Sequence, residues 1–364
     1  MSERITAIYR VRDSAAAIEA RAKTIAVEQS VEMPVSAITK RSVLEHIVGE
    51  VQDIRDLGGV FEVSIGLAVS TTGLEAGQTL NMLFGNSSIH ADIVLHDAIF
   101  PSEVLRTFAG PHHGIDGLRK RVGAGRRALT CSALKPQGLT PAELAALAAQ
   151  FTRGGLDFIK DDHGLADQAY SPFSERVPAV AAAVRAAQGT VPTRYLPSLS
   201  GNLDQLRRQI EIVRKSELDG VLIAPMIVGV PAYHTLVREN PDIAFMAHPA
   251  MAGAAHIAPA FLLGKLFRLF GADATVFPNH GGRFGYTPQD CRTLARTALA
   301  PWDSIKPAVP VPAGGMTTDR ITEMLDFYGH DVMLLIGGAL LAAGPRLTEE
   351  TRAFVEAVHA YGKG

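Results

Sequence analysis

The stretch 128–163, ALTCSALKPQGLTPAELAALAAQFTRGGLDFIKDDH, places an amphipathic helix between two short apolar runs. The runs predict strands over 128–136 and 156–162, and the helix is expected over 140–153. A strand, a crossover helix and a second strand form the unit from which parallel sheets are built. The stretch therefore predicts a parallel α/β fold.

The same alternation continues to the C-terminus and gives eight strand–helix units, with further helices expected over 203–216 and 318–329. Eight is the number of units in a closed (β/α)₈ TIM barrel, which we predict for residues 127–364. The strand candidates are ALTCSALKP (128–136), LDFIKDD (156–162), TRYLPSLSG (193–201), DGVLIAPMIVG (219–229), IAFMAHPAM (243–251), ATVFPNHGG (274–282), AVPVPAGG (308–315) and DVMLLIGG (331–338).

Residues 1–126 lack this alternation and predict a smaller α+β domain in front of the barrel. VFEVSIGLAVS (60–70) and SIHADIVLHDAIF (88–100) are expected to be strands, and SVLEHIVGEVQDIRDL (42–57) is expected to be a helix. The boundary is placed at the turn-forming residues 123–127.

The composition excludes several classes of protein. The 35 basic and 37 acidic residues give a net charge of −2, which argues against a nucleic-acid partner. No apolar run is long enough for a membrane span, and the N-terminus lacks a signal peptide. Only Cys131 and Cys291 are present, without the spacing of a disulfide framework, so both are expected to be reduced core thiols of a cytoplasmic protein.

Reactive groups of a (β/α)₈ barrel project from the C-terminal ends of its strands. There the sequence places Lys135, the run Lys160-Asp161-Asp162-His163, and His248. Because side chains alternate along a strand, Lys160 and Asp162 face the same side. They are either a metal site, if the lysine becomes a carbamate that offers oxygen ligands, or a solvated rim. Lys135 alone is equally compatible with a surface lysine, and His248 alone with a core histidine.

Two glycine pairs, Gly314-Gly315 and Gly337-Gly338, end strands seven and eight. Glycine lets backbone N–H groups approach an anion closely, and the helix that follows adds its positive end. These loops commonly hold phosphate in TIM barrels, so a monophosphate site is predicted here in preference to simple tight turns.

Together these residues resemble the large chain of ribulose bisphosphate carboxylase (RuBisCO), and more closely the RuBisCO-like proteins of the form IV type. GGLDFIKDDH (154–163) is similar to the family signature GGLDF-x-KDDE. FAGPHHGIDGLR (108–119) and SALKPQGLT (132–140) resemble two further family segments, so the likeness covers essentially the whole chain. The resemblance implies an α+β domain, a TIM barrel and a homodimer with active sites at the subunit interface.

The resemblance also implies roles for single residues. Lys160 corresponds to the lysine that CO₂ carbamylates and that binds Mg²⁺ with Asp162. His163 stands where the family has a glutamate ligand, and its imidazole suits other divalent metals better than Mg²⁺. Lys135 corresponds to the lysine that moves protons on the enediolate. His248 resembles the active-site histidine of strand five, and Glu28 resembles the glutamate that reaches the neighbouring subunit's site.

Several residues differ from the family pattern, and these differences limit which substrates and reactions are expected. Gln137 replaces a second lysine, Met33-Pro34 replaces a Thr-Trp pair, and Gln78 falls near an asparagine that touches substrate. The strand-five motif H-R-x-x-H reads HPAMA (248–252), without the arginine and histidine of the second phosphate site. Arg283 is expected to replace the charge of the mobile loop lysine. A bisphosphate would leave a dianion against apolar groups, so neither ribulose bisphosphate nor CO₂ fixation is expected.

The remaining chemistry is metal-dependent enolate formation on a singly phosphorylated ketose or sugar acid. We expect an isomerase of the 5-methylthioribulose 1-phosphate type, since the retained lysine can return a proton. The first alternative is a decarboxylase (lyase) of a phosphorylated 3-oxo sugar acid, of the 3-oxo-isoapionate 4-phosphate type. The second is a noncatalytic phosphosugar-binding protein, for which Lys135, Lys160 and Asp162 would be unnecessary.

Overall fold

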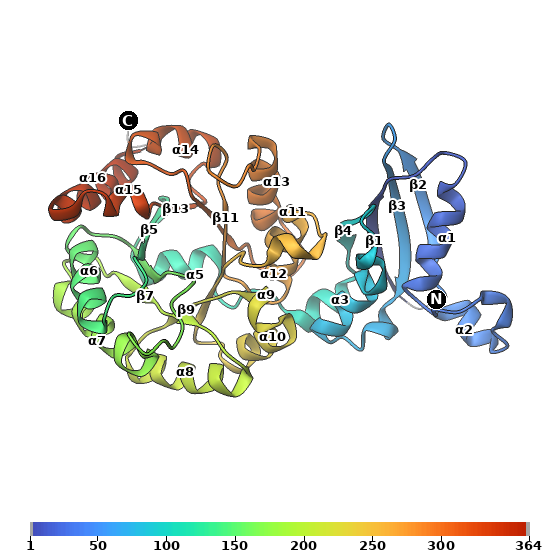
Figure 1. Cartoon of the computed structure of the whole chain (residues 1–364), viewed down its shortest axis with the longest axis horizontal. Coiled ribbons are helices and arrows are strands. Elements are labelled where there is room, and N and C mark those ends of the chain that lie inside the picture. The colour runs from blue at the N-terminus through green and yellow to red at the C-terminus, as the bar shows by residue number, and fades with distance from the viewer. Residues whose placement is uncertain (1–2, 362–364) are drawn as a thin grey trace. The chain divides into compact units, whose positions relative to one another are not determined.

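The computed structural model describes residues 3–361, which form two compact units (Figure 1). One unit comprises the chain up to Ala109 together with residues 251–262 and 303–305. The other holds residues 110–250, 263–302 and the chain from Lys306 onward. The domain boundary expected at residues 126 and 127 stays a prediction.

The first unit contains a four-stranded antiparallel sheet in the order β2-β3-β1-β4. The strands are β1 (Arg4–Val11), β2 (Glu50–Asp56), β3 (Phe61–Ala68) and β4 (Ile93–Ile99). The helices of this unit are α1 (Ile18–Glu28), α2 (Arg41–His46), α3 (Ala76–Phe84), α4 (Ser102–Phe108) and α11 (Pro259–Phe261).

The helix expected over 42–57 is only half right. Helix α2 ends at His46, and residues 50–56 form the edge strand β2, which pairs with β3 from Glu50↔Gly66 to Asp56↔Phe61. The apolar residues of this segment are compatible with either period, and the sheet edge offered by β3 favours the extended form.

The second unit is a closed parallel barrel of eight strands, as predicted. Its nine-stranded sheet runs β7-β6-β5-β13-β12-β11-β10-β9-β8. Its two ends, β7 and β8, are halves of one strand interrupted at Pro197, so the sheet closes on itself. Proline has no N–H for the strand ladder, which explains the break. The strands are β5 (Leu129–Leu134), β6 (Phe158–Asp161), β7 (Arg194–Leu196), β8 (Ser198–Leu199), β9 (Gly220–Ile223), β10 (Ala244–Ala247), β11 (Ala274–Pro278), β12 (Val309–Ala313) and β13 (Met333–Leu335).

Helices surround this barrel, which Figure 1 views nearly along its axis. Several begin with caps that the sequence encodes: Thr140, Asn202 and Thr287 each form a capping box. The helices are α5 (Gly114–Arg121), α6 (Pro141–Arg153), α7 (Phe173–Ala187), α8 (Leu203–Lys215), α9 (Pro225–Val228), α10 (Val230–Glu239), α12 (Phe267–Leu269), α13 (Pro288–Leu299), α14 (Ile321–Tyr328), α15 (Gly338–Leu341) and α16 (Leu347–Ala360).

Apolar side chains fill the barrel interior in stacked layers. Leu129 and Cys131 of β5, Phe158 of β6 and Leu222 of β9 all belong to this buried cluster. Both cysteines, Cys131 and Cys291, are free and buried, as expected. The barrel interior is therefore a packed core and not an open pore.

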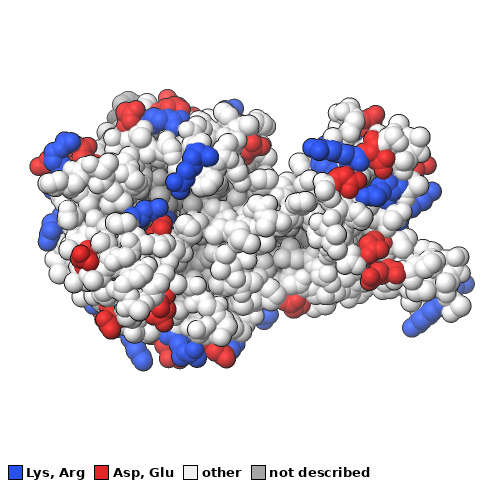
Figure 2. Space-filling model, viewed as in Figure 1, with Lys and Arg blue, Asp and Glu red and all other residues white. Residues whose placement is uncertain are grey.

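Most of the visible face of the barrel is formed by uncharged residues, and the charged residues of either sign are scattered, chiefly near its outline, without a continuous patch (Figure 2). Among the described residues, every helix is too short or too polar to cross a bilayer.

Candidate active site

Lys160 lies near the C-terminal end of β6, and 3% of its surface is exposed. Strand pairing sets it beside Ala133 of β5 and Leu196 of β7. Its Nζ donates a hydrogen bond to the main-chain oxygen of Asp161 at 3.0 Å. Burial lowers the pKa of Lys160, and the charge of Lys135 lowers it further, while Cys131 and Asp162 oppose the shift. The environment therefore favours the neutral amine more than water does.

Asp162 connects Lys160 with the rim of the barrel. Its Oδ1 lies 3.1 Å from Nζ of Lys135 and 3.5 Å from Nδ1 of His163. Burial raises the pKa of Asp162, but the His163 hydrogen bond and the charges of Lys135 and Lys160 outweigh it, so the net shift is downward. Asp162 is thus a permanent carboxylate between two lysines.

His248, which follows β10, is held as a neutral imidazole of defined tautomer. Its Nδ1 accepts a hydrogen bond from the N–H of Ala250 at 3.1 Å, so its proton resides on Nε2. Its ring stacks on His163 with centroids 4.2 Å apart and an interplanar angle of 7°. Burial lowers the pKa of His248 to about 2, and the charges of Lys160 and His163 add to the effect. His248 can donate a hydrogen bond to a substrate oxygen but is a poor base.

This lowered pKa predicts a pH dependence of stability in the metal-free protein. Between the unfolded value of 6.5 and the folded value of about 2, the unfolded chain binds a proton at His248 that the folded chain does not. Stability therefore falls as the pH falls through this window, by at most about 1.4 kcal/mol per pH unit.

Urea denaturation of the wild type and of His248→Gln measures the effect. Between pH 7 and pH 5 the wild type should lose about 2 kcal/mol more of its free energy of unfolding than the variant. Parallel pH profiles for the two proteins would show that His248 is not held neutral.

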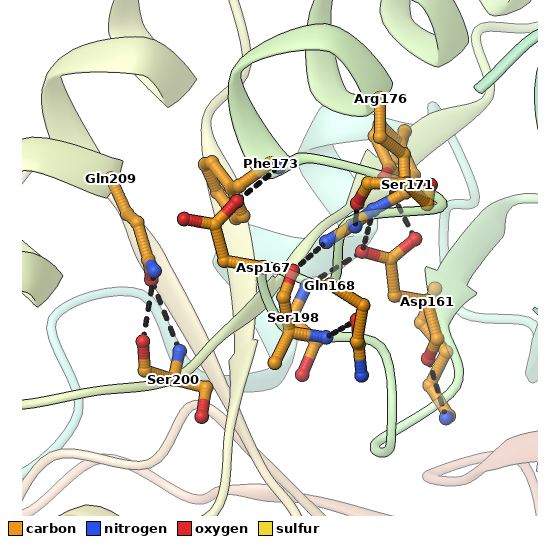
Figure 3. A network of polar contacts seen from close by, with 12 residues as sticks. Asp161, Asp167, Gln168, Ser171, Phe173, Arg176, Ser198, Ser200 and Gln209 are labelled. Carbon is orange, nitrogen blue, oxygen red and sulfur yellow. Dashed lines mark hydrogen bonds and ion pairs between the residues drawn. The ribbon is translucent and has the colours of Figure 1, made fainter. Parts of the chain in front are cut away.

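Asp161 points to the opposite side of β6, toward the helices, and sequence reasoning assigned it no role. Its carboxylate accepts hydrogen bonds from Tyr195 Oη (2.7 Å) and the Ser198 N–H (3.0 Å), and Arg176 Nε lies 3.2 Å away (Figure 3). Burial raises the pKa of Asp161, while Arg176 opposes it. Three donors around the carboxyl group favour the ionised form. The sequence contained one indication of this orientation: side chains alternate along a strand, so Asp161 must face away from Lys160 and Asp162.

The glycine pairs lie on adjacent strand ends, since Ala313 of β12 pairs with Leu335 of β13. Gly314 and Gly315 have φ values of +82° and +65°, a conformation that side-chain-bearing residues rarely adopt. A Cβ at Gly315 would approach the Gly282 backbone to 2.7 Å, whereas Gly337 faces open space. Gly338 begins α15 and lines the same groove as Lys135. Gly338 and Lys135 therefore lie on one groove.

The remaining predicted residues do not lie in this cluster. Arg283 is exposed between β11 and α13, with its guanidinium 5.0 Å from the ring of Phe284. Glu28 ends α1 in the first unit and accepts a hydrogen bond from Asn86 at 2.8 Å. Gln78 lies on α3, where its Nε2 donates to Thr71 O at 3.2 Å. Their roles stay predictions.

Asp162, His163 and Lys160 can together bind a metal ion only if Lys160 is converted to a carbamate. No three His, Cys, Asp or Glu residues within 3–361 form a group that could hold a metal ion. Asp162 and His163 offer one oxygen and one nitrogen side by side, and a carbamate on Lys160 would add anionic oxygens at the missing third position. Asp162, His163 and a carbamate on Lys160 would thus together supply a ligand set that fits a divalent ion.

The comparisons with known proteins agree with this geometry. Residues 114–346 match the model of the family "ribulose bisphosphate carboxylase large chain, catalytic domain". Over 362 residues the chain is 58% identical to the 5-methylthioribulose-1-phosphate isomerase of Rhodospirillum rubrum, covering 98% of this chain and 97% of that protein. It is 32% identical to the 2,3-diketo-5-methylthiopentyl-1-phosphate enolase of Geobacillus kaustophilus over 270 residues, 71% of this chain and 65% of that one. The crystal structure of a Rubisco-like protein from Rhodopseudomonas palustris superposes with a TM-score of 0.94 at 51% identity, with complete coverage of both chains.

Proposed function

The chain belongs to the ribulose bisphosphate carboxylase large-chain family, among its RuBisCO-like members, and we propose that it isomerises 5-methylthioribulose 1-phosphate or a closely similar singly phosphorylated ketose. The observation that carries the proposal is the convergence of Lys135, Lys160, Asp162 and His248 at one barrel mouth. The isomerase of Rhodospirillum rubrum, similar over its whole length, supports the choice of substrate.

The proposed cofactors are CO₂, bound as a carbamate on Lys160, and a divalent metal, by default Mg²⁺. Lys160 would hold the metal through the carbamate, Asp162 through its carboxylate and His163 through a ring nitrogen. When bound, such an ion polarises a carbonyl oxygen and stabilises the negative charge of an enediolate.

The chain's own groups move the proton. Lys135 removes a proton from the hydroxyl-bearing carbon beside the ketone and returns it to the former carbonyl carbon. The hydroxyl proton passes to the former carbonyl oxygen, so the ketone shifts by one position. A carbamate on Lys160, if formed, would supply a second base beside Lys135. Lys135 Nζ, 3.1 Å from Asp162, lies next to the predicted metal ligands. His248 donates through Nε2–H to a substrate oxygen, because its Nδ1 is already an acceptor.

The phosphate is bound by the backbone at Gly314, Gly315, Gly337 and Gly338. Beside the glycine loop after β12, the ends of β11 and then β10 read Val276 to His280 and His248-Pro249-Ala250, without lysine or arginine. A second phosphate would lack a counter-charge there, whereas an apolar thioether end would not require one. This asymmetry supports a substrate with one phosphate.

A methyl group at Gly337 is expected to block phosphate without disturbing the fold. No heavy atom lies within 4 Å of a Cβ built at this position. Gly337→Ala should therefore keep the wild-type melting temperature and raise KM for the phosphorylated substrate about tenfold or more, because the methyl occupies the space of the anion. The control is Gly189→Ala, on the loop before β7, where the space is equally open. An unchanged KM in Gly337→Ala would place the phosphate elsewhere.

We also propose that a second copy of the chain completes the site. A groove of about 670 Å³ between α6 and α15–α16 is lined by apolar residues such as Leu147 and Leu341 and reaches Lys135 at its edge. In the first unit, Met33 and Val35 are exposed apolar residues that follow Glu28 closely. Docking of this segment into the groove of a partner would cover apolar surface and bring Glu28 to Lys135 of the partner.

Leu147→Glu is expected to weaken this dimer and to lower turnover with it, since a buried charge opposes docking. Light scattering combined with gel filtration measures the dimer, and the activity of the same fractions measures turnover. Val191→Glu, at an exposed apolar position outside the groove, is the control. A fully active monomer would contradict the proposal.

The proposed reaction is tested by NMR in D₂O. The protein is incubated with Mg²⁺, bicarbonate and, separately, 5-methylthioribulose 1-phosphate, the 2,3-diketo phosphate of the related enolases, and a phosphorylated 3-oxo sugar acid. The expected result is isomerisation of the first compound with exchange at a carbon-bound proton. Release of CO₂ from the third would identify a decarboxylase, and no exchange with any compound would favour the noncatalytic alternative.

A further inference from the structure

Asp161 lies between two proposed metal ligands and points away from both. It is fully buried, and its carboxylate is enclosed by donors from three other elements: Arg176 of α7, Tyr195 of β7 and Ser198 of β8. Tyr195 precedes and Ser198 follows the break of the third barrel strand at Pro197. One carboxylate therefore ties the tip of β6 to both halves of the neighbouring strand.

Arg176 also contacts the loop between β6 and α7. We call Asp161 and its donors Arg176, Tyr195 and Ser198 the Asp161 clamp. Its guanidinium donates to Ser171 O at 2.7 Å and to Ala166 O at 2.8 Å, while its Nε faces Asp161 (Figure 3). Arg176 has no exposed surface, so none of these bonds competes with water. Asp161 is thus held through its side chain, on the face of β6 opposite to Lys160 and Asp162. The network of hydrogen bonds does not include the residues at the mouth of the barrel.

The main-chain oxygen of Asp161 is the acceptor for Lys160 Nζ, at 3.0 Å. When a neutral amine reacts with CO₂, a nitrogen–carbon bond forms and one proton leaves nitrogen for solvent. The product keeps a single N–H. That N–H can continue to donate to Asp161 O, which leaves only one direction, away from this oxygen, for the new carboxylate.

We infer that Asp161 is a positioning residue: its buried carboxylate holds its own carbonyl oxygen in place, and this oxygen orients Nζ of Lys160 so that a carbamate forms facing Asp162. This inference rests on the proposed function, because it requires the carbamate. Groups that orient metal ligands from behind typically change metal affinity 10- to 100-fold when removed.

The matched control is Asp157, the residue directly before β6. It is also fully buried and is bonded to an arginine, Arg127, at 2.7 Å through both carboxylate oxygens. Asp157→Asn and Asp161→Asn each remove the negative charge of a buried aspartate that pairs with an arginine. Loss of stability should be similar in both, so only an effect beyond stability distinguishes them.

The test measures carbamate and metal directly. The carbamate is quantified by ¹³C NMR with ¹³C-bicarbonate, and metal affinity is measured by the EPR signal of free Mn²⁺. In Asp161→Asn we expect carbamate occupancy at limiting CO₂ and Mn²⁺ affinity to fall about tenfold or more, with Asp157→Asn at the wild-type level. Tyr195→Phe, which removes one donor and keeps the charge pair, should shift both in the same direction by less.

Wild-type carbamate occupancy and Mn²⁺ affinity in Asp161→Asn would overturn the inference, as would equal losses in Asp157→Asn. If Asp161→Asn does not fold, unchanged values in Tyr195→Phe overturn it. A wild type without carbamate would do the same. A wild type that forms the carbamate but turns over none of the three phosphorylated compounds would refute the proposed function and leave the role of Asp161 standing.

Discussion

Replacing Lys160 by methionine is expected to abolish turnover while the protein stays folded. The variant loses the side chain proposed as the third metal ligand beside Asp162 and His163, so the expected fall in kcat is about 10⁴-fold or more. Methionine matches the length of the buried stem, and it removes an amine whose pKa burial already lowers. The free energy of unfolding should therefore be equal to that of the wild type or higher.

Steady-state kinetics and urea denaturation on the same preparation separate these effects. Lys215→Met, at the C-terminal end of α8, controls for the loss of a lysine elsewhere on the barrel. Calorimetric binding of the phosphorylated substrate should persist in Lys160→Met, because the glycine loops are untouched. A variant with wild-type turnover would show that the reaction does not use this lysine.

Replacing Lys135 by methionine has the second largest expected effect. Its Nζ is the remaining candidate acid or base at the mouth, and loss of such a group typically costs 10²- to 10⁴-fold in rate. The carbamate should still form in this variant at saturating CO₂, because Lys160 donates its hydrogen bond to Asp161 and not to Lys135. At limiting CO₂ its occupancy should fall, because the charge of Lys135 helps to lower the pKa of Lys160. The loss is therefore expected in kcat and in proton exchange at a CO₂ concentration that saturates the carbamate.

Lys135→Arg distinguishes proton transfer from charge. Arginine keeps a positive group near Asp162, but it does not give up its proton in a protein. We expect Lys135→Arg to be as inactive as Lys135→Met in exchange of the substrate's carbon-bound proton in D₂O. Recovery of most activity in Lys135→Arg would show that Lys135 acts through its positive charge near Asp162 and does not transfer a proton.

The barrel was predictable because each strand is a short apolar run with a capped helix behind it. The predicted helices 140–153 and 203–216 differ from α6 and α8 by one residue at an end. The strand predicted over 219–229 is too long, because β9 ends at Ile223 and Pro225 starts α9. Apolar composition alone does not distinguish these two states over so short a run.

The geometry within the site depends on contacts that no local pattern encodes. The sequence placed Lys135, Asp162 and His248 on strand ends, but it gave no sign that His163 stacks on His248 or that Lys135 pairs with Asp162. The first contact joins the ends of β6 and β10, which are not neighbours in the sheet, and the second joins the ends of the paired strands β5 and β6. The contacts of Asp161 with Tyr195 and Arg176 were not predicted either. Both partners come from other elements, and the local sequence marks them only as a core residue and a helix residue.

A crystal structure of the wild type grown with bicarbonate and Mg²⁺ tests the central claim most directly. The account predicts electron density for a carboxyl group on Nζ of Lys160 and for a metal ion beside it and Asp162. An unmodified lysine together with an Asp162 that binds no metal, at saturating concentrations of both, would contradict it.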